Sequence, residues 1–197
     1  MGGDLLYKNK YQVNSIRWRG WNYGWAGYYF VTICVAHRQC VFGKIKNGKM
    51  VVNEAGKIVS DEWLKTGVIR PNVYLHEHVV MPNHFHAVIE IVNINNNVET
   101  HCMRLPNTGN AATGDACNAS LRPDGVPNKF GPQKNNLASI IRGFKSATTA
   151  LIRKTGFDSF SWQPLYHDHI IRDEFELARI QKYIQDNPAN WENDELF

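Results

Sequence analysis

Apolar side chains in the first half of the chain gather in short runs that are typical of β-strands. The run at 28–36 is rich in aromatic and β-branched residues and predicts a central strand. The stretch at 41–45 is predicted to return as its hairpin partner, ahead of the turn signal Lys46-Asn47-Gly48-Lys49. Two further runs, 73–80 and 84–92, predict the arms of a second hairpin.

Helical periodicity marks three other segments. Residues 53–65 and 137–152 each carry apolar side chains three or four positions apart, which predicts amphipathic helices. A third helix is predicted to begin at an Asp173 N-cap and to end near Asn187, because Pro188 follows. The side chains expected to bury one face of this last helix are Phe175, Leu177, Ile180 and Ile184.

With a further strand predicted at 162–171, the element order is β-β-α-β-β-α-β-α. This order predicts an α+β fold, in which helices pack on the faces of a ferredoxin-like antiparallel sheet. The 197 residues suffice for one such domain, expected at 28–191. Segment 93–135 is rich in Asn, Gly and Pro and predicts a mobile insertion within it.

The chain ends differ from this body in composition. Residues 1–27 form a basic and aromatic arm, in which Arg17 and Arg19 alternate with tryptophans and are candidate nucleic-acid contacts. An arm packed over the edge of the core is the alternative. Residues 192–197 form an acidic tail. The net charge of +4 divides into +9 for residues 1–172 and −5 for the last 25, so the basic body favours a polyanionic partner.

The sequence predicts no membrane segment, since the apolar runs are short and the first residues lack the apolar core of a signal peptide. Its four cysteines contain no C-x-x-C pair. We therefore expect reduced thiols and a cytoplasmic location.

The strongest candidate chemistry is the segment Met81-Pro82-Asn83-His84-Phe85-His86 at the start of a predicted strand. Side chains alternate between the faces of a strand, so His84 and His86 point the same way and Phe85 points into the core. Two neutral imidazoles side by side form a bidentate metal site with positions left open. An open metal site is suited to chemistry.

Tyr183 and Asn187 lie four residues apart and therefore on one face of the last predicted helix. If that helix crosses the sheet, Asn187 completes a three-ligand metal site and Tyr183 stands beside it as a nucleophile. A half-buried structural tyrosine is the alternative. Glu90 shares the strand face of the histidines and is a competing third ligand for a water-activating hydrolase.

Other polar residues have two interpretations each. Arg142 and Lys145 share the polar side of the predicted helix at 137–152, where they are candidate phosphate contacts or a solvated face. His76 and His78 are assigned supporting or core roles rather than metal ligation. The remaining histidine candidates, which could line a DNA path, are His167 and His169.

Four blocks of the sequence, in order, resemble the REP-associated tyrosine transposases, a branch of the single-tyrosine HUH transposases. The segment Met81–His86 resembles their histidine-hydrophobic-histidine signature, and Gly27–Cys34 resembles their first strand. Ile141-Arg142-Gly143-Phe144-Lys145-Ser146 resembles their middle helix. The fourth block runs from Trp162-Gln163 through His167–Arg172 to Tyr183-Ile184 and Asn187-Pro188.

The resemblance implies a strand transferase that acts on single-stranded DNA with REP-like hairpins near its cleavage sites. Carried over, His84, His86 and Asn187 hold a divalent cation, Mg²⁺ or Mn²⁺, and Tyr183 is the nucleophile. Attack by the tyrosine gives a 5′-phosphotyrosyl intermediate and a free 3′-hydroxyl. Imidazole ligands suit Mn²⁺ better, whereas Mg²⁺ is more available. A nucleoid-associated protein is implied.

Two other functions remain open at this point: a module that binds hairpin nucleic acid without cutting it, and a metal-dependent phosphodiester hydrolase that uses water. The presence of His84, His86 and Tyr183 together favours the enzyme. A monomer places Tyr183 beside its own histidines, and a homodimer could exchange the last helices. The resemblance favours the monomer.

Overall fold

The computed structural model describes residues 21–93 and 136–194. Its centre is a four-stranded sheet with the order β4-β5-β1-β6, in which every neighbouring pair is antiparallel. The strands are β1 (Gly27–Cys34), β4 (Val73–Val80), β5 (His84–Ile91) and β6 (His167–Ile171). The sheet and its helices confirm the predicted α+β class.

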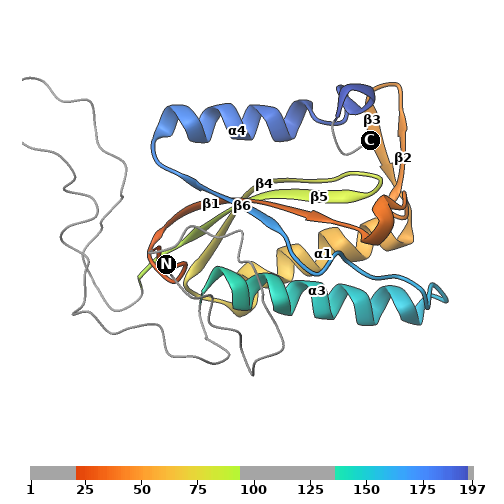
Figure 1. Ribbon diagram of the computed structural model, residues 1–197, viewed down its shortest axis with the longest axis horizontal. Helices are drawn as coiled ribbons and strands as arrows, with labels where there is room; N and C mark the ends of the chain where they lie inside the picture. The colour runs from red at the N-terminus through yellow and green to blue at the C-terminus, as the bar shows by residue number, and fades with distance from the viewer. Residues whose placement is uncertain (1–20, 94–135, 195–197) are drawn as a thin grey trace, which may run out of the picture.

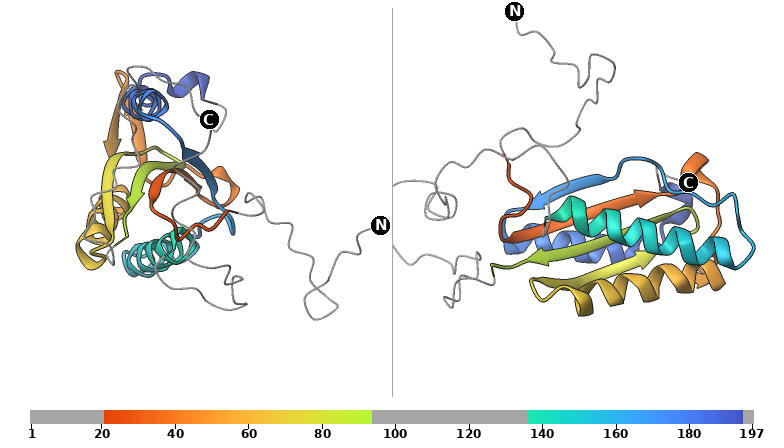
Figure 2. Two further views of the ribbon diagram at one scale, coloured as in Figure 1. Left: turned by 90° about the vertical axis from the view of Figure 1, so that its left-hand side faces the viewer. Right: turned by 90° about the horizontal axis from the view of Figure 1, so that it is seen from below.

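Helices cover both faces of this sheet (Figures 1 and 2). α1 (Glu54–Ile69) and α3 (Leu137–Lys154) lie side by side on one face, and α4 (Glu174–Asp186) crosses the other. The main core lies between the sheet and the α1–α3 layer. There the Trp63 ring contacts Phe85 and Phe144, with ring centroids 5.1 and 5.2 Å apart.

Side-chain caps fix where the helices begin. The Asn53 side chain accepts a hydrogen bond from the Gly56 amide at 3.0 Å, and Asn136 forms a capping box with Ser139. Asp173 accepts from the Glu176 amide at 2.8 Å, which confirms the predicted start of α4. This cap sets the entry of the helix that carries Tyr183.

The predicted partner of the first strand was wrong. β2 (Gly43–Lys46) pairs with β3 (Lys49–Val52), a strand that the sequence pattern did not predict, and the two form a separate sheet. Both edges of β1 are taken by β5 and β6. The left-handed backbone of His37 and Arg38 turns the chain away after β1.

Two further expectations need correction. The strand predicted at 162–171 is shortened to β6, and Trp162 makes only an isolated bridge with Val35. Phe175, expected to be buried, is 89% exposed. It precedes the buried Ile180 by five residues, a rotation of about 140° around the helix, so it points away from the sheet.

Arg17, Arg19 and most of the predicted insertion at 93–135 lie outside the described residues. The last part of the predicted arm is described, and it packs on the core. Tyr23 is buried, and the Trp21 indole donates to the Tyr29 hydroxyl at 3.2 Å. None of the helices in the described part of the chain combines the length and apolar character needed to cross a membrane.

Candidate metal and tyrosine site

The two histidines of the His-Phe-His segment open β5 on the face of the sheet that α4 covers. Their ring centroids are 4.5 Å apart, and both side chains are buried. Phe85 between them points to the opposite face, where it packs against Trp63 and Phe144. Strand alternation thus gives one segment a side that presents two neighbouring imidazoles and a side that joins the core.

Hydrogen bonds orient both rings by their Nδ1 atoms. His84 Nδ1 lies 2.7 Å from Asn83 Oδ1, and His86 Nδ1 lies 2.8 Å from Thr32 Oγ1. The amide oxygen of Asn83 is an acceptor, so His84 carries its proton on Nδ1 and presents a lone pair on Nε2. Such partners fix the ring orientation of metal-ligating histidines.

The electrostatic environment keeps both imidazoles neutral. Burial lowers the pKa of His84 to about 4, although the nearby Asp194 carboxylate opposes the shift. Burial and the adjacent His84 hold the pKa of His86 well below its usual value of 6.5. Neutral imidazole is the form that binds metal ions.

α4 brings Tyr183 and Asn187 to the histidines. The Tyr183 hydroxyl lies 3.4 Å from His86 Nε2, and its ring meets Phe30 edge-on at 6.1 Å. Tyr183 is 46% exposed, whereas Asn187, at the end of the helix, is buried. The nucleophile predicted from the sequence is therefore open to solvent on one side, and the predicted amide ligand is enclosed.

Asp194 is a site residue that the sequence reasoning missed. Its carboxylate oxygen lies 3.7 Å from His84 Nε2 and accepts a hydrogen bond from Asn187 Nδ2 at 3.2 Å. One ligand atom each from His84, His86 and Asp194 lie within 4.8 Å of one another. The short helix η2 (Trp191–Asn193) returns the chain to the site, and the Trp191 ring stacks on His84 with centroids 6.0 Å apart.

Two buried atoms at this site fit a cation. His84 Nε2 and Asn187 Oδ1 have no hydrogen-bond partner within the described residues. Leaving a buried polar atom without a partner costs about 1–3 kcal/mol, so such atoms call for a ligand. Two imidazole nitrogens, an amide oxygen and a carboxylate oxygen form a donor set suited to a divalent metal such as Mn²⁺ or Mg²⁺.

Glu90, the competing ligand, lies on the same face but at the far end of β5. It pairs with His76 at 3.1 Å and does not belong to the His84–His86–Asp194 group. The carboxylate beside the histidine pair comes from the C-terminal segment instead. Sequence proximity on the strand thus favoured the wrong acidic residue.

The other candidate histidines have separate surroundings. His78 lies beside Phe85, with ring centroids 6.0 Å apart, and burial lowers its pKa. His169 pairs with Glu176 in the first turn of α4 at 2.7 Å, which helps to anchor that helix. His167 is exposed opposite Thr32 in the β1–β6 register, so it borders the site two strands from His86.

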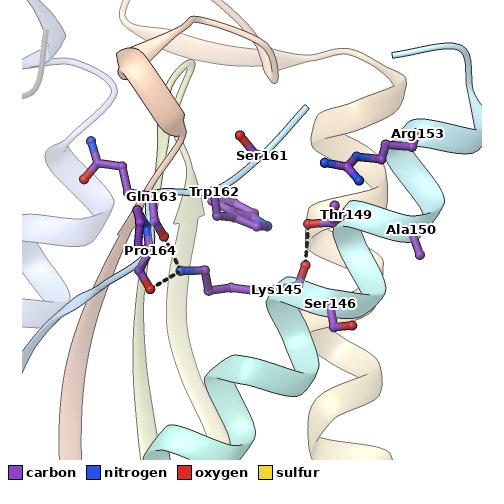
Figure 3. A pocket seen from close by; sticks show the side chains of 9 residues that line it. All are labelled: Lys145, Ser146, Thr149, Ala150, Arg153, Ser161, Trp162, Gln163 and Pro164. Atoms are coloured by element: carbon purple, nitrogen blue, oxygen red, sulfur yellow. Dashed lines mark hydrogen bonds between the residues drawn. The ribbon is translucent and has the colours of Figure 1, made fainter. Parts of the chain in front are cut away.

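The two basic candidates on α3 differ in their surroundings. Arg142 is exposed, whereas Lys145 is half-buried and lines a cavity of about 490 Å³ between α3 and the segment before β6 (Figure 3). The Lys145 ammonium donates to the carbonyl oxygens of Gln163, Pro164 and Leu165. Lys145 therefore fixes the segment 163–165 that leads into β6. It does so from α3, which lies on the sheet face opposite the histidines.

No family model matches the chain. An uncharacterized protein of Haemophilus influenzae is 38% identical over 183 residues, which are 93% of this chain and 92% of that protein. Among solved structures, a REP-associated tyrosine transposase bound to a REP hairpin has 18% identity and a TM-score of 0.52, with 90% of this chain and 74% of the other covered. The chain belongs to the family of the Haemophilus influenzae protein and shares the fold of that transposase.

Proposed function

We propose that this protein is a metal-dependent tyrosine strand transferase that cuts and rejoins single-stranded DNA carrying hairpins. The observation that supports it best is the 3.4 Å approach of the Tyr183 hydroxyl to His86 Nε2, beside the unpartnered His84 Nε2 and Asn187 Oδ1. A nucleophile next to an open donor set is the arrangement that attack on a phosphodiester requires.

The reaction exchanges one phosphodiester for another. The Tyr183 hydroxyl gives up its proton as its oxygen attacks the phosphorus, the bond from phosphorus to the 3′-oxygen breaks, and that leaving oxygen takes up one proton, so no net proton is gained or lost. The products are a 5′-phosphotyrosine and a free 3′-hydroxyl, so the reverse step can join a new end without an external energy source. A bound Mg²⁺ or Mn²⁺ would polarise the phosphate and stabilise the charge that develops on its oxygens.

The residues around the nucleophile have defined tasks in this proposal. His84, His86 and Asn187 would hold the cation, and Asp194 would add a carboxylate. Thr32 and Asn83 orient the two imidazoles through Nδ1. The Tyr183 hydroxyl lies beside His86 of its own chain, and we propose a reaction within one protomer.

Three observations support a DNA hairpin as the substrate. The solved transposase with this fold is bound to a REP hairpin, and the basic body of this chain suits a polyanion. The half-exposed Tyr183 leaves room for a strand to reach the nucleophile. Arg142, Arg17 and Arg19 are the proposed phosphate contacts, and Lys145 contributes by positioning the crossover.

The test is a covalent trapping assay. Labelled hairpin-bearing single-stranded oligonucleotides are incubated with the protein and Mn²⁺ or Mg²⁺ and run on a denaturing gel. We expect a protein–DNA adduct that disappears in Tyr183→Phe. The matched control is Tyr74→Phe, which changes a tyrosine of similar exposure on the edge strand β4 and should retain the adduct.

A metal-dependent hydrolase is the second candidate, and Asp194 is the observation that favours it. A carboxylate beside two imidazoles resembles the ligand sets with which metals activate water. Cleavage that survives in Tyr183→Phe but is lost in Asp194→Asn would establish this hydrolase and refute the transferase. Retention of the hairpin without any cleavage would indicate a binding module.

A further inference from the structure

A cavity of about 590 Å³ opens beside the histidine pair, between the β2–β3 hairpin and the segment that follows α4. Its lining includes Cys40, Ile45, Asn47, Pro82, Pro188, Trp191 and Glu192. The proposed metal ligands and Tyr183 do not line it. The cavity is therefore a neighbouring space that the proposed chemistry leaves without a role.

The cavity and the metal site share their supporting segments. Pro82 lies two residues before His84, and Pro188 directly follows Asn187. Trp191 lines the cavity while its ring stacks on His84, with an interplanar angle of 30°. A phosphate held at the histidines would thus have an adjacent nucleotide within reach of the cavity.

The cavity is held open by backbone contacts of the hairpin. The Phe42 amide donates to the Pro82 carbonyl at 3.0 Å, which ties the start of β2 to the histidine turn. On the other side, Gly48 has a φ of +69°, and an added Cβ would lie 3.6 Å from the Ala189 Cα. The hairpin tip therefore lies next to the segment after α4, and this segment and the histidine turn bound the cavity on two sides.

The lining matches a flat ring with polar edges. Trp191, Pro82 and Pro188 supply apolar rings, and Asn47 and Glu192 add an amide and a carboxylate. Nucleobases stack on aromatic side chains, and the volume lies within the 300–1,000 Å³ of small-molecule sites. An unpaired base is free to turn into such a lining, whereas a paired base would first have to leave its duplex stack.

On the basis of the proposed function, we infer that this cavity binds one unpaired nucleobase next to the cleaved phosphate. The base would fix which phosphodiester of the strand lies at the histidines, so the β2–β3 hairpin would determine cleavage position. The hairpin that would do this is the separate two-stranded sheet, which lines the cavity from the side opposite the segment after α4.

Alkylation of Cys40 tests the inference without requiring cleavage. Cys40 is exposed and lines the cavity, whereas Cys34 is buried. Cys102 and Cys117 are replaced by serine, and Tyr183→Phe prevents reaction with DNA. With Mn²⁺ present, short random-sequence single strands should protect Cys40 from alkylation at about tenfold lower concentration than strands of abasic sites with equal phosphates, because one stacked base is worth about that factor in affinity. Inorganic phosphate should not protect Cys40.

Two tryptophan substitutions on the same hairpin provide the matched comparison. Ile45→Trp fills the cavity and should make alkylation insensitive to the bases. Val51→Trp adds the same ring at a position that is 46% exposed and does not line the cavity, so protection should persist. Equal protection by base-bearing and abasic strands, or protection that persists in Ile45→Trp, would overturn the inference.

The outcome is separable from that of the proposed function. Loss of base-dependent protection together with a normal Tyr183 adduct would refute the base site and leave the transferase intact. Base-dependent protection in a protein that never forms the adduct would refute the transferase and retain the base site.

Discussion

The two faces of the central sheet differ in what their side chains do. On the α1–α3 face, Phe85 and Ile89 of β5 join a large buried aromatic and aliphatic core. On the α4 face, the alternate positions of the same strand are His84, His86 and Val88, and the apolar cluster beneath α4 is small. One strand therefore contributes to the main core on one side and to the proposed metal site on the other.

This contrast explains how α4 is held. With little apolar contact, the helix also depends on polar anchors in its first turn and its middle. Gln181 donates to Glu77 of β4 at 2.5 Å, and His169 pairs with Glu176 at 2.7 Å. The helix that carries Tyr183 is therefore held with less buried apolar surface than the α1–α3 layer, which would suit the proposed entry of a DNA strand beside it.

Phe85→Ala should have the largest effect on stability, because it opens a cavity among Trp63 and Phe144. We expect the free energy of unfolding to fall by about 3–5 kcal/mol in urea titrations. Phe175→Ala is the control, since that ring is 89% exposed and its removal should change stability by no more than about 0.5 kcal/mol. Similar losses in both variants would contradict the assignment of the main core.

His84→Ala changes the residue next to Phe85 on β5, whose side chain points to the α4 face. This substitution should reduce the proposed DNA cleavage much more than stability. Adduct formation should fall by about 10²–10³-fold, as expected when charge stabilisation at a phosphate is lost. Hairpin affinity, measured by fluorescence anisotropy, should change far less. Comparable losses of cleavage and affinity would instead assign the histidine a structural role.

The buried histidines of the α4 face should make the stability of the protein depend on pH, whereas the apolar side chains on the other side of β5 should not. The folded pKa of His84 is about 4 against 6.5 when exposed, so the unfolded chain binds more protons between these values. In the metal-free protein, stability is fully present above pH 6.5 and is lost as pH falls toward 4. The loss between pH 7 and pH 5 is about 2 kcal/mol from His84 alone, and His86 adds to it in the same direction.

Urea titrations at the two pH values measure this loss in the wild type and in His84→Gln. The variant should show a shallower dependence, because one buried base has been removed. A slope equal to that of the wild type would show that other groups control the acid sensitivity.

The local features of the fold were predictable because they depend on neighbouring residues. Strand alternation separated Phe85 from His84 and His86, and the Asp173 cap marked the start of α4. The partner of β1 was mispredicted, since hairpin signals do not show that both edges of a strand are already occupied. Asp194 was missed because its approach to His84 depends on the turn of η2, which no local pattern encodes.

The position of Tyr183 beside His86 could not be predicted from neighbouring residues alone. Helical spacing put it on one face with Asn187, but spacing does not show where a helix lies on a sheet. The contact between Tyr183 and His86 joins residues 97 positions apart. The sequence predicted this contact only through the resemblance of four motif blocks, in order, to the REP-associated tyrosine transposases. Neither helical spacing nor strand alternation predicts it.

Thr32→Val should have the smallest effect of these substitutions. It tests whether a single hydroxyl on the α4 face orients the His86 ring. Thr32 lies on β1 opposite His86 and bonds its Nδ1 at 2.8 Å, so the substitution keeps the shape but removes the group that orients the ring. We expect Mn²⁺ affinity, measured by calorimetry, to fall about tenfold, with little change in unfolding free energy. Thr66→Val is the control: this buried threonine bonds the Glu62 carbonyl within α1 on the opposite face, so Mn²⁺ affinity should not change. If Thr32→Val leaves Mn²⁺ affinity unaltered, the hydroxyl does not position His86, and packing of the ring on Phe30, with centroids 5.3 Å apart, must orient it instead.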